Sequence, residues 1–261
     1  MTKARIDGAA RLMLPKGLAT TGEPSLNALA NVAGDSFDDW QRQINRIILA
    51  KDTDGFYSAR NVLMSIPRQT GKTYDIEWVA IHRAGSNPGI RIVWTAQHFS
   101  VLHDTFEDMC SRVLRPEMGH LVDPEHGISL AAGKEEIRFR NGSRIFFRAR
   151  ERGALRGFKK VGLLVVDEAQ ILSDGAKASM LPTQNRAYNP QTIYMGTPPG
   201  PRDQGEAFTR QRDKALAGRA HSTFYVEFSA DRRCDPLDRT QWTKANPSYP
   251  RHTSEDAILE L

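Results

Sequence analysis

The sequence is poor in the residues and patterns that several protein classes require. Its 261 residues contain only two cysteines, Cys110 and Cys234, and neither has the spacing of a zinc site. Because no export signal is recognisable, we expect no disulfide between them. No apolar run approaches the roughly 18–20 residues that cross a bilayer. The first 17 residues hold a four-residue apolar stretch, too short for a secretory signal. We therefore expect a cytoplasmic protein without a membrane segment.

What is present is an ordinary globular composition with an uneven positive charge. Hydrophobic residues make up 39% of the chain and charged residues 26%. The length suits one large α/β domain, or a core of about 200 residues with a small appendage. The net charge is +5, yet residues 134–160 alone hold ten Lys or Arg against three Glu. This segment fits a solvated basic face and a surface that contacts phosphates equally well.

Apolar, strand-like segments alternate with helix-like segments along the middle of the chain. This alternation predicts a mainly parallel sheet with helices on both faces. Asn141-Gly142 predicts a hairpin turn. We expect a loosely ordered N-terminal arm over residues 1–35, the core over 36–200, and a lid subdomain or linker over 201–261. Strands are expected at 61–66, 90–95, 136–140, 144–149, 161–166, 191–195 and 223–229, and helices at 37–51, 73–84 and 100–114.

A phosphate-binding loop is expected between the strand at 61–66 and the helix that follows it. The segment reads Pro67-Arg68-Gln69-Thr70-Gly71-Lys72-Thr73. In a strand–loop–helix context, backbone N–H groups face the phosphates, the lysine reaches the β- and γ-phosphate oxygens, and the threonine hydroxyl binds Mg²⁺. The full pattern has a further glycine where this chain has Ile66. An ordinary turn is the alternative reading of the segment.

Two adjacent carboxylates, Asp167 and Glu168, end the apolar strand at 161–166. Successive side chains diverge at the end of a strand, so the first carboxylate can hold the metal while the second activates water. By itself the pair also fits a strand followed by an acidic helix start. The carboxylates follow the phosphate loop in the expected order, however, with Asp167 95 residues after Lys72. A small-molecule kinase would not need Glu168.

Thr197 follows Gly196 at the end of another apolar strand, just before two prolines. A hydroxyl at this place can sense the γ-phosphate and pass its loss to the next segment. The alternative is a strand that simply ends at prolines. Upstream, Trp40 and Gln41 are candidates for binding adenine by stacking and by hydrogen bonds of the amide. Trp40 fits equally well as a core residue of an amphipathic helix.

Arginines are candidates for stabilising charge on the transferred phosphate. Arg68 lies inside the phosphate loop and can act within the chain. Arg150, Arg152 and Arg156 lie in a glycine-containing loop before the Asp-Glu strand, where one of them can reach the nucleotide of a neighbouring subunit. We single out Arg156 as the catalytic candidate of this loop. A DNA-facing or solvated loop is the alternative.

The order of these motifs resembles that of the large terminase subunit of tailed double-stranded DNA phages. Many members of that family have a phosphate loop that lacks the first glycine, so Ile66 favours this family over a generic helicase. The resemblance extends over residues 37–250 and includes Trp242 and the Ala245–Ser248 segment. It rests on a Trp-Gln helix followed by PRQTGKT, IRIVWTAQ, ALRG, LLVVDEAQ and MGTPPG.

The resemblance implies an ATPase with the P-loop fold of the additional-strand, catalytic-glutamate type and a small lid subdomain. ATP and Mg²⁺ would be the cofactors. Lys72 and Thr73 would bind phosphate, Thr73 and Asp167 the metal, and Glu168 would activate water. Thr197 would couple hydrolysis to motion, and Arg68 matches an arginine that some members use.

The resemblance also implies partners and a setting. Such proteins form a homo-oligomeric ring at the portal of a procapsid in the host cytoplasm. They drive double-stranded DNA inward and work with a small terminase subunit. The family's C-terminal nuclease domain has no counterpart after residue 200, so we expect a truncated chain that does not cut DNA.

Two other functions remain open at this point. A superfamily-2-like helicase or translocase has similar motifs but needs a second RecA-like domain, for which this chain is too short. A module that binds ATP without hydrolysing it would not need Glu168.

Overall fold

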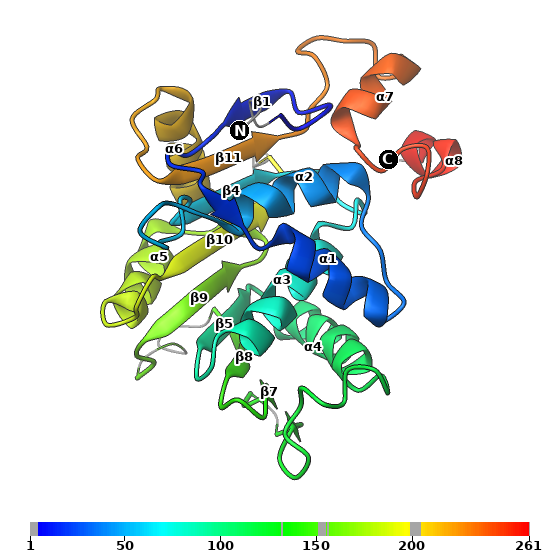
Figure 1. Cartoon of the computed structure of the whole chain (residues 1–261). Helices are drawn as coiled ribbons and strands as arrows, with labels where there is room; N and C mark the ends of the chain where they lie inside the picture. Colours follow the sequence, from blue (N-terminus) through cyan, green and yellow to red (C-terminus); the bar gives the residue numbers. More distant parts are fainter. Residues whose placement is uncertain (1–4, 132, 151–154, 156, 199–204, 261) are drawn as a thin grey trace.

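A nine-stranded sheet forms the centre of the computed structural model, which describes residues 5–131, 133–150, 155, 157–198 and 205–260 (Figure 1). Its strand order is β1-β11-β4-β10-β9-β5-β8-β7-β6. The six strands from β11 to β8 are parallel, while β1, β7 and β6 pair antiparallel. The strands are β1 Arg11–Met13, β4 Asn61–Ser65, β5 Arg91–Ala96, β6 Ile128–Ser129, β7 Glu136–Arg138, β8 Arg144–Ala149, β9 Val161–Val166, β10 Gln191–Gly196 and β11 Thr223–Glu227.

Helices cover both faces of this sheet, as the alternation of segments predicts (Figure 1). Neighbouring residues of one strand serve opposite faces: Val62 packs in the core under the first four helices, and Leu63 in the core under α5 and α6. All six residues of β9 are buried, which explains its continuous apolar run. The helices are α1 Glu23–Val32, α2 Asp39–Ile48, α3 Lys72–Ser86, α4 Phe99–Val113, α5 Asp174–Met180, α6 Glu206–Leu216, α7 Arg239–Ala245 and α8 Glu255–Leu259.

The expected loosely ordered arm over residues 1–35 is wrong for the described part of that segment. β1 closes the sheet by pairing with β11, and Arg11 forms an ion pair with the buried Glu227. Leu26 and Ala30 of α1 are fully buried. The sheet therefore takes one strand from residues 1–35 and another from residues 201–261. A three-residue strand is too short to show a readable alternation, which is why the sequence pattern missed β1.

The hairpin at Asn141-Gly142 is confirmed, because β7 and β8 pair antiparallel on either side of it. After β11 the chain forms a small unit with α7 and α8, which lies outward from the sheet beyond α2 (Figure 1). Trp242 anchors this unit: its indole N–H donates to the Pro236 carbonyl, and its ring meets Tyr249 edge-on. Within the described residues, no helix combines the length and the apolarity needed to span a membrane. One further strand pair, β2 Thr20–Thr21 with β3 Ala50–Lys51, and two 3-10 turns, η1 Ala169–Ile171 and η2 Leu181–Gln184, complete the described fold.

His82 of α3 joins the first and third helices. Its Nε2 lies 2.5 Å from the Ser25 hydroxyl of α1, and the side chain is buried. Burial, together with the nearby charges of Arg83 and Lys51, lowers the pKa of His82 to about 4. The folded protein thus keeps this imidazole neutral in a range where the unfolded chain protonates it.

Stability is therefore expected to fall below pH 6.5 for a reason specific to His82. As pH falls from 6.5 toward 4, the unfolded state binds a proton that the folded state does not, so the free energy of unfolding falls. Between pH 7 and pH 5 this loss amounts to about 2 kcal/mol for a folded pKa of about 4. Urea unfolding of the wild type and of His82→Gln at both pH values measures it. Parallel losses in the two proteins would contradict this assignment.

Candidate nucleotide-binding site

The three motifs singled out in the sequence meet at one edge of the sheet. β10 lies between β4 and β9, and all three strands run in the same direction. Their carboxyl ends lead into Thr197, into the phosphate loop and into Asp167, respectively. Adjacent parallel strands therefore place these residues side by side, at the end of the sheet where open α/β folds bind ligands.

The phosphate loop curls around Lys72. Gln69 and Gly71 both have left-handed backbone angles, with φ values of 59° and 82°, and this turns the chain sharply into α3. The Lys72 Nζ and the Thr70 hydroxyl each donate to the Pro67 carbonyl over 3.1 Å. The loop thus encloses the lysine at the N-terminus of a 15-residue helix, a suitable place for an anion.

Arg68 projects from the loop toward solvent. It is exposed, and it forms no hydrogen bond or ion pair with any other described residue. Its positive charge lowers the pKa of Lys72, which places it near the lysine. An exposed arginine at this point can fold over a bound phosphate or reach a neighbouring chain.

Lys72 faces the carboxylates at the end of β9. Burial lowers its pKa, while the charges of Asp167 and Glu168 oppose this shift. Asp167 is 5% exposed, and burial raises its pKa to about 6. A buried carboxylate whose ionised form is disfavoured gains from a cation beside it. The structure thus brings the predicted lysine and both predicted carboxylates together.

The residues present fit a magnesium ion. The Asp167 carboxylate and the Thr73 hydroxyl are oxygen donors, which Mg²⁺ prefers. In the part of the chain that the structure describes, no three His, Cys, Asp or Glu residues gather into a cage. Magnesium is usually held by one or two carboxylates together with substrate phosphates, so a single carboxylate beside a phosphate loop suits it.

Glu168 is turned away from Asp167 by a left-handed backbone, with φ of 50°. A non-glycine residue rarely adopts this conformation, and such strain gathers at functional sites. The Glu168 Oε2 accepts a hydrogen bond of 3.3 Å from the backbone N–H of Gln97 at the end of β5. The carboxylate is half-buried beside Lys72, where it can accept a proton from a water molecule.

Arg150 is a site residue whose place the sequence did not reveal. The sequence makes it one of three loop arginines that can reach a neighbouring subunit, but its guanidinium points inward and donates to the carbonyls of Thr95, Asp167 and Glu168. Burial lowers its pKa to about 10. Arg150 thus binds the ends of β5 and β9 together. The only local signal was its position directly after β8. Arg152 and Arg156 lie outside the described residues.

Gln170 connects the carboxylates to the strand end that carries Thr197. Its Oε1 accepts a hydrogen bond of 3.4 Å from the Thr197 backbone N–H. Gly196 leaves room for this contact, because a Cβ there would lie 2.5 Å from the Gln170 Oε1 and 2.9 Å from its backbone nitrogen. The sensing role of the Thr197 hydroxyl remains a prediction.

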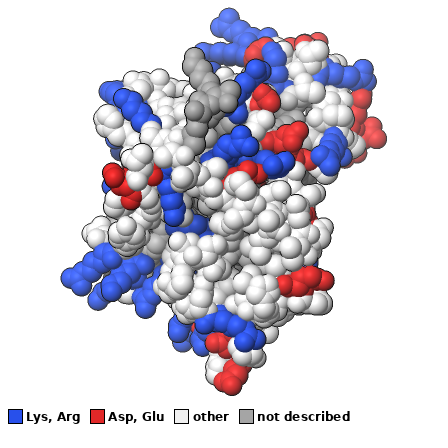
Figure 2. Space-filling view, viewed as in Figure 1, with Lys and Arg blue, Asp and Glu red and all other residues white. Residues whose placement is uncertain are grey.

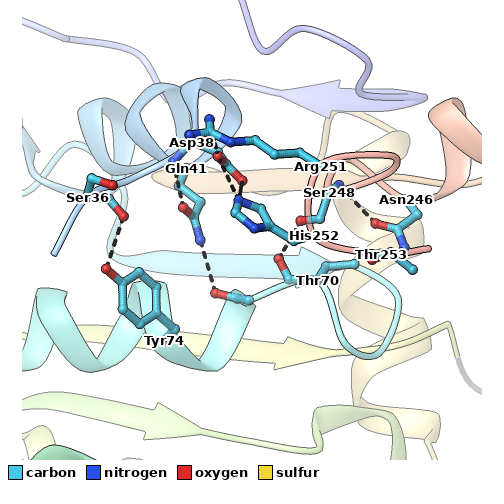
Figure 3. A network of polar contacts seen from close by, with 11 residues as sticks. Ser36, Asp38, Gln41, Thr70, Tyr74, Asn246, Ser248, Arg251, His252 and Thr253 are labelled. Carbon is cyan, nitrogen blue, oxygen red and sulfur yellow. Dashed lines mark hydrogen bonds and ion pairs between the residues drawn. The ribbon is translucent and has the colours of Figure 1, made fainter. Parts of the chain in front are cut away.

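The structure corrects the prediction that Trp40 stacks on adenine. Trp40 is 5% exposed and packs edge-on against Phe228, with ring centroids 5.8 Å apart. It belongs to the core face of the amphipathic helix α2. Gln41, the next residue, points to the loop instead. Its Oε1 accepts from the Asp38 N–H over 2.8 Å, and its Nε2 donates to the Gly71 carbonyl over 3.1 Å (Figure 3).

Gln41 also lines a cavity of about 360 Å³ beside the phosphate loop. Tyr74 and His252 line the same cavity. The predicted role of Gln41 in binding adenine would require the base to enter this cavity and compete for the amide.

The unit after β11 contacts the loop, which no local pattern in the sequence indicated. The Ser248 hydroxyl donates to the Thr70 carbonyl over 2.7 Å, across 178 positions of sequence (Figure 3). Arg251 and His252 both contact the carboxylate of Asp38, at 2.8 Å and 3.2 Å. The phosphate loop is thus held by α2 through Gln41 and by the C-terminal unit through Ser248.

No family model matches the chain, and no curated protein matches it in sequence. Solved structures do match. The large terminase of bacteriophage HK97 aligns with a TM-score of 0.78 and 18% identity, over 92% of this chain and 50% of that one. The chain has the fold of a phage large terminase. It spans about half the length of the HK97 protein.

Two further terminases show the same fold. The large terminase ATPase domain of Thermus phage P74-26 aligns with a TM-score of 0.50 and 18% identity, over 65% of this chain and 68% of that one. The large terminase of a thermophilic bacteriophage, solved in complex with ADP, aligns with a TM-score of 0.50 and 11% identity, over 80% of this chain and 45% of that one. At these identities the similarity concerns the fold.

Gly196→Ala is expected to lower the free energy of unfolding by about 2 kcal/mol, because the added methyl group overlaps the backbone of Gln170 and overpacks the site. Gly175→Ala in α5 is the matched control, since a Cβ there meets nothing within 4 Å. Urea unfolding of both variants measures the difference. Equal stability of the two variants would show that η1 moves away from the methyl group at no cost.

Proposed function

We propose that this chain is an ATP-hydrolysing motor domain that powers translocation of viral double-stranded DNA into a procapsid. The observation that carries the proposal is that Lys72 of the phosphate loop lies near Asp167 and Glu168, at the ends of two parallel strands that flank β10. The terminase fold and the ADP complex of a protein with that fold support it.

Binding of the nucleotide begins at the loop. Lys72 and the backbone N–H groups at the start of α3 would hold the β- and γ-phosphates. Thr73 and Asp167 would hold magnesium, which when bound neutralises charge on the phosphate oxygens. The Lys72 Nζ, which donates to the Pro67 carbonyl in the structure, would then bind the phosphates, and Asp167 would bind the metal.

Hydrolysis requires a base on the far side of the γ-phosphate. Glu168 directly follows Asp167 in the chain, and its left-handed backbone conformation turns it away from the metal ligand. It would accept a proton from the attacking water, while Arg68 would stabilise the charge that develops on the phosphate. Arg150 fixes the carbonyls around these carboxylates and so keeps the base in position.

Loss of the γ-phosphate would be passed on through Thr197. Gln170 ties the Thr197 backbone to the segment that carries the carboxylates, so a shift of one reaches the other. We further propose that the chain acts in a homo-oligomeric ring with the portal protein, the small terminase subunit and double-stranded DNA in the host cytoplasm. Arg156 of one chain would complete the site of its neighbour.

Glu168→Gln is expected to reduce ATP hydrolysis by about 10²-fold or more, because the amide cannot accept the proton, while ATP binding persists. Steady-state hydrolysis and binding of a fluorescent ATP analogue measure the two effects. Glu125→Gln, which changes an exposed glutamate, is the control. Unchanged turnover in Glu168→Gln would remove Glu168 from the mechanism.

A mixing experiment tests whether Arg156 acts between chains. Arg156→Ala and Glu168→Ala are each expected to be inactive alone. Their mixture should regain part of the activity, because an Arg156→Ala chain keeps its own base and receives the arginine of its neighbour. A mixture of Arg68→Ala and Glu168→Ala should stay inactive, since each chain then has a defect in its own site that a neighbour does not repair. Absence of rescue in the first mixture would refute a role of Arg156 between chains.

A further inference from the structure

The edge of the sheet opposite the nucleotide site carries two neighbouring cavities lined by basic residues. One, of about 540 Å³, is lined by Lys51, Arg83, Lys160 and Arg186 among others. The second, of about 600 Å³, is lined by Arg60 and shares a wall residue, Ala187, with the first. Among the described residues that line either cavity there is no Asp or Glu. The charged side chains of the described walls are thus all basic.

Arg83 makes the first cavity unusual. It is 2% exposed, and its guanidinium lies 4.1 Å above the ring of Tyr57. Its Nη1 donates to the Gln191 side chain over 2.8 Å, but its Nε has no partner, and no carboxylate within the described chain pairs with it. A buried charge without a counter-ion is costly. An anion in this cavity would supply the missing partner.

Exposed basic residues extend the surface beyond the cavities. Lys159, Arg91 and Arg144 are exposed and lie at or just before the starts of β9, β5 and β8. Figure 2 shows Lys and Arg side chains gathered at the lower left, where the central strands begin, with few acidic side chains among them. Tyr188, which lines the first cavity and is 81% exposed, contacts Phe56, with ring centroids 5.6 Å apart.

The extent of this basic edge indicates the kind of anion. The two cavities lie along the starts of β4, β10, β9 and β5, a width of about 14 Å at the usual strand spacing. A single phosphate would use one recess only. A row of phosphates on a polymer would engage the recess and the exposed cations on either side of it.

We propose that this basic edge binds the phosphate backbone of double-stranded DNA, with one phosphate in the recess beside Arg83. The proposal rests on the proposed function and names the DNA-contacting surface of the motor. Contacts to phosphates fix position without reading sequence, which suits a protein that moves along any DNA.

The experiment measures binding of a fluorescent DNA duplex to the whole chain over a salt series, without nucleotide. The variant is Lys160→Gln with Arg186→Gln, two exposed positions far from the phosphate loop. We expect about a tenfold loss of affinity. The plot of log affinity against log salt should also become shallower, with the magnitude of its slope reduced by about two, since each lost phosphate contact removes about 0.9. Arg232→Gln with Arg233→Gln, exposed in the C-terminal unit, is the matched control and should bind as the wild type does.

Equal duplex affinity in the variant and the control would overturn the proposal. A second arm separates DNA from a free anion: inorganic phosphate is added to the wild type and to Arg83→Met, and the melting temperatures are compared. One outcome is that phosphate raises the melting temperature of the wild type only, while the variant with Lys160→Gln and Arg186→Gln binds the duplex as tightly as the wild type does. In that case the cavity takes a free anion and the DNA assignment fails. Hydrolysis lost in Glu168→Gln tests the motor separately, so the two proposals can fail independently.

Discussion

Parallel pairing of β10 between β4 and β9 is the constraint on which the site depends. Gly196 pairs with Ser65, so β10 and β4 end together, and Tyr194 pairs with Val166, so β10 continues two residues beyond the end of β9. A slip of one residue would move each buried side chain to the other face and would also separate the loop from the carboxylates. The same hydrophobic pattern that buries the strands therefore sets the distance between Lys72 and Asp167. Here stability of the core and geometry of the chemistry have one cause.

The phosphate loop is held from two sides that are remote in sequence. Gln41 bonds to the carbonyl of Gly71, and Ser248 to the carbonyl of Thr70. Asp38 joins the two supports, since it begins α2 and also contacts Arg251 and His252. A bound nucleotide that shifts the loop will therefore act on α2 and on the C-terminal unit together.

The sequence predicted the features that arise from local pattern. The strands at 61–66, 90–95 and 161–166 were readable because buried parallel strands are continuously apolar. The hairpin was readable because Asn-Gly suits its turn. Motifs whose members lie within seven residues, such as the loop ending in Lys72 and the Asp167-Glu168 pair, could be placed for the same reason.

What the sequence did not predict depends on tertiary packing. Trp40 lies on an amphipathic helix, and periodicity alone does not distinguish a core tryptophan from one that faces a ligand. Arg150 follows a strand, and only the pairing of β8 with β5 turns it toward the carboxylates. The contact of Ser248 with Thr70 joins positions that share no pattern. β1 was too short to recognise.

Two stiff elements run between the phosphate loop and the basic edge. Lys72 and Arg83 are about 17 Å apart along α3 at 1.5 Å per residue, and β10 extends from Gln191 to Gly196. Their far ends are joined to each other by the hydrogen bond between Arg83 and Gln191. The two elements are thus joined at the end that carries the cations, and the phosphate loop lies at the other end of α3. If the two elements move together, a small displacement of the loop becomes a displacement of the opposite edge.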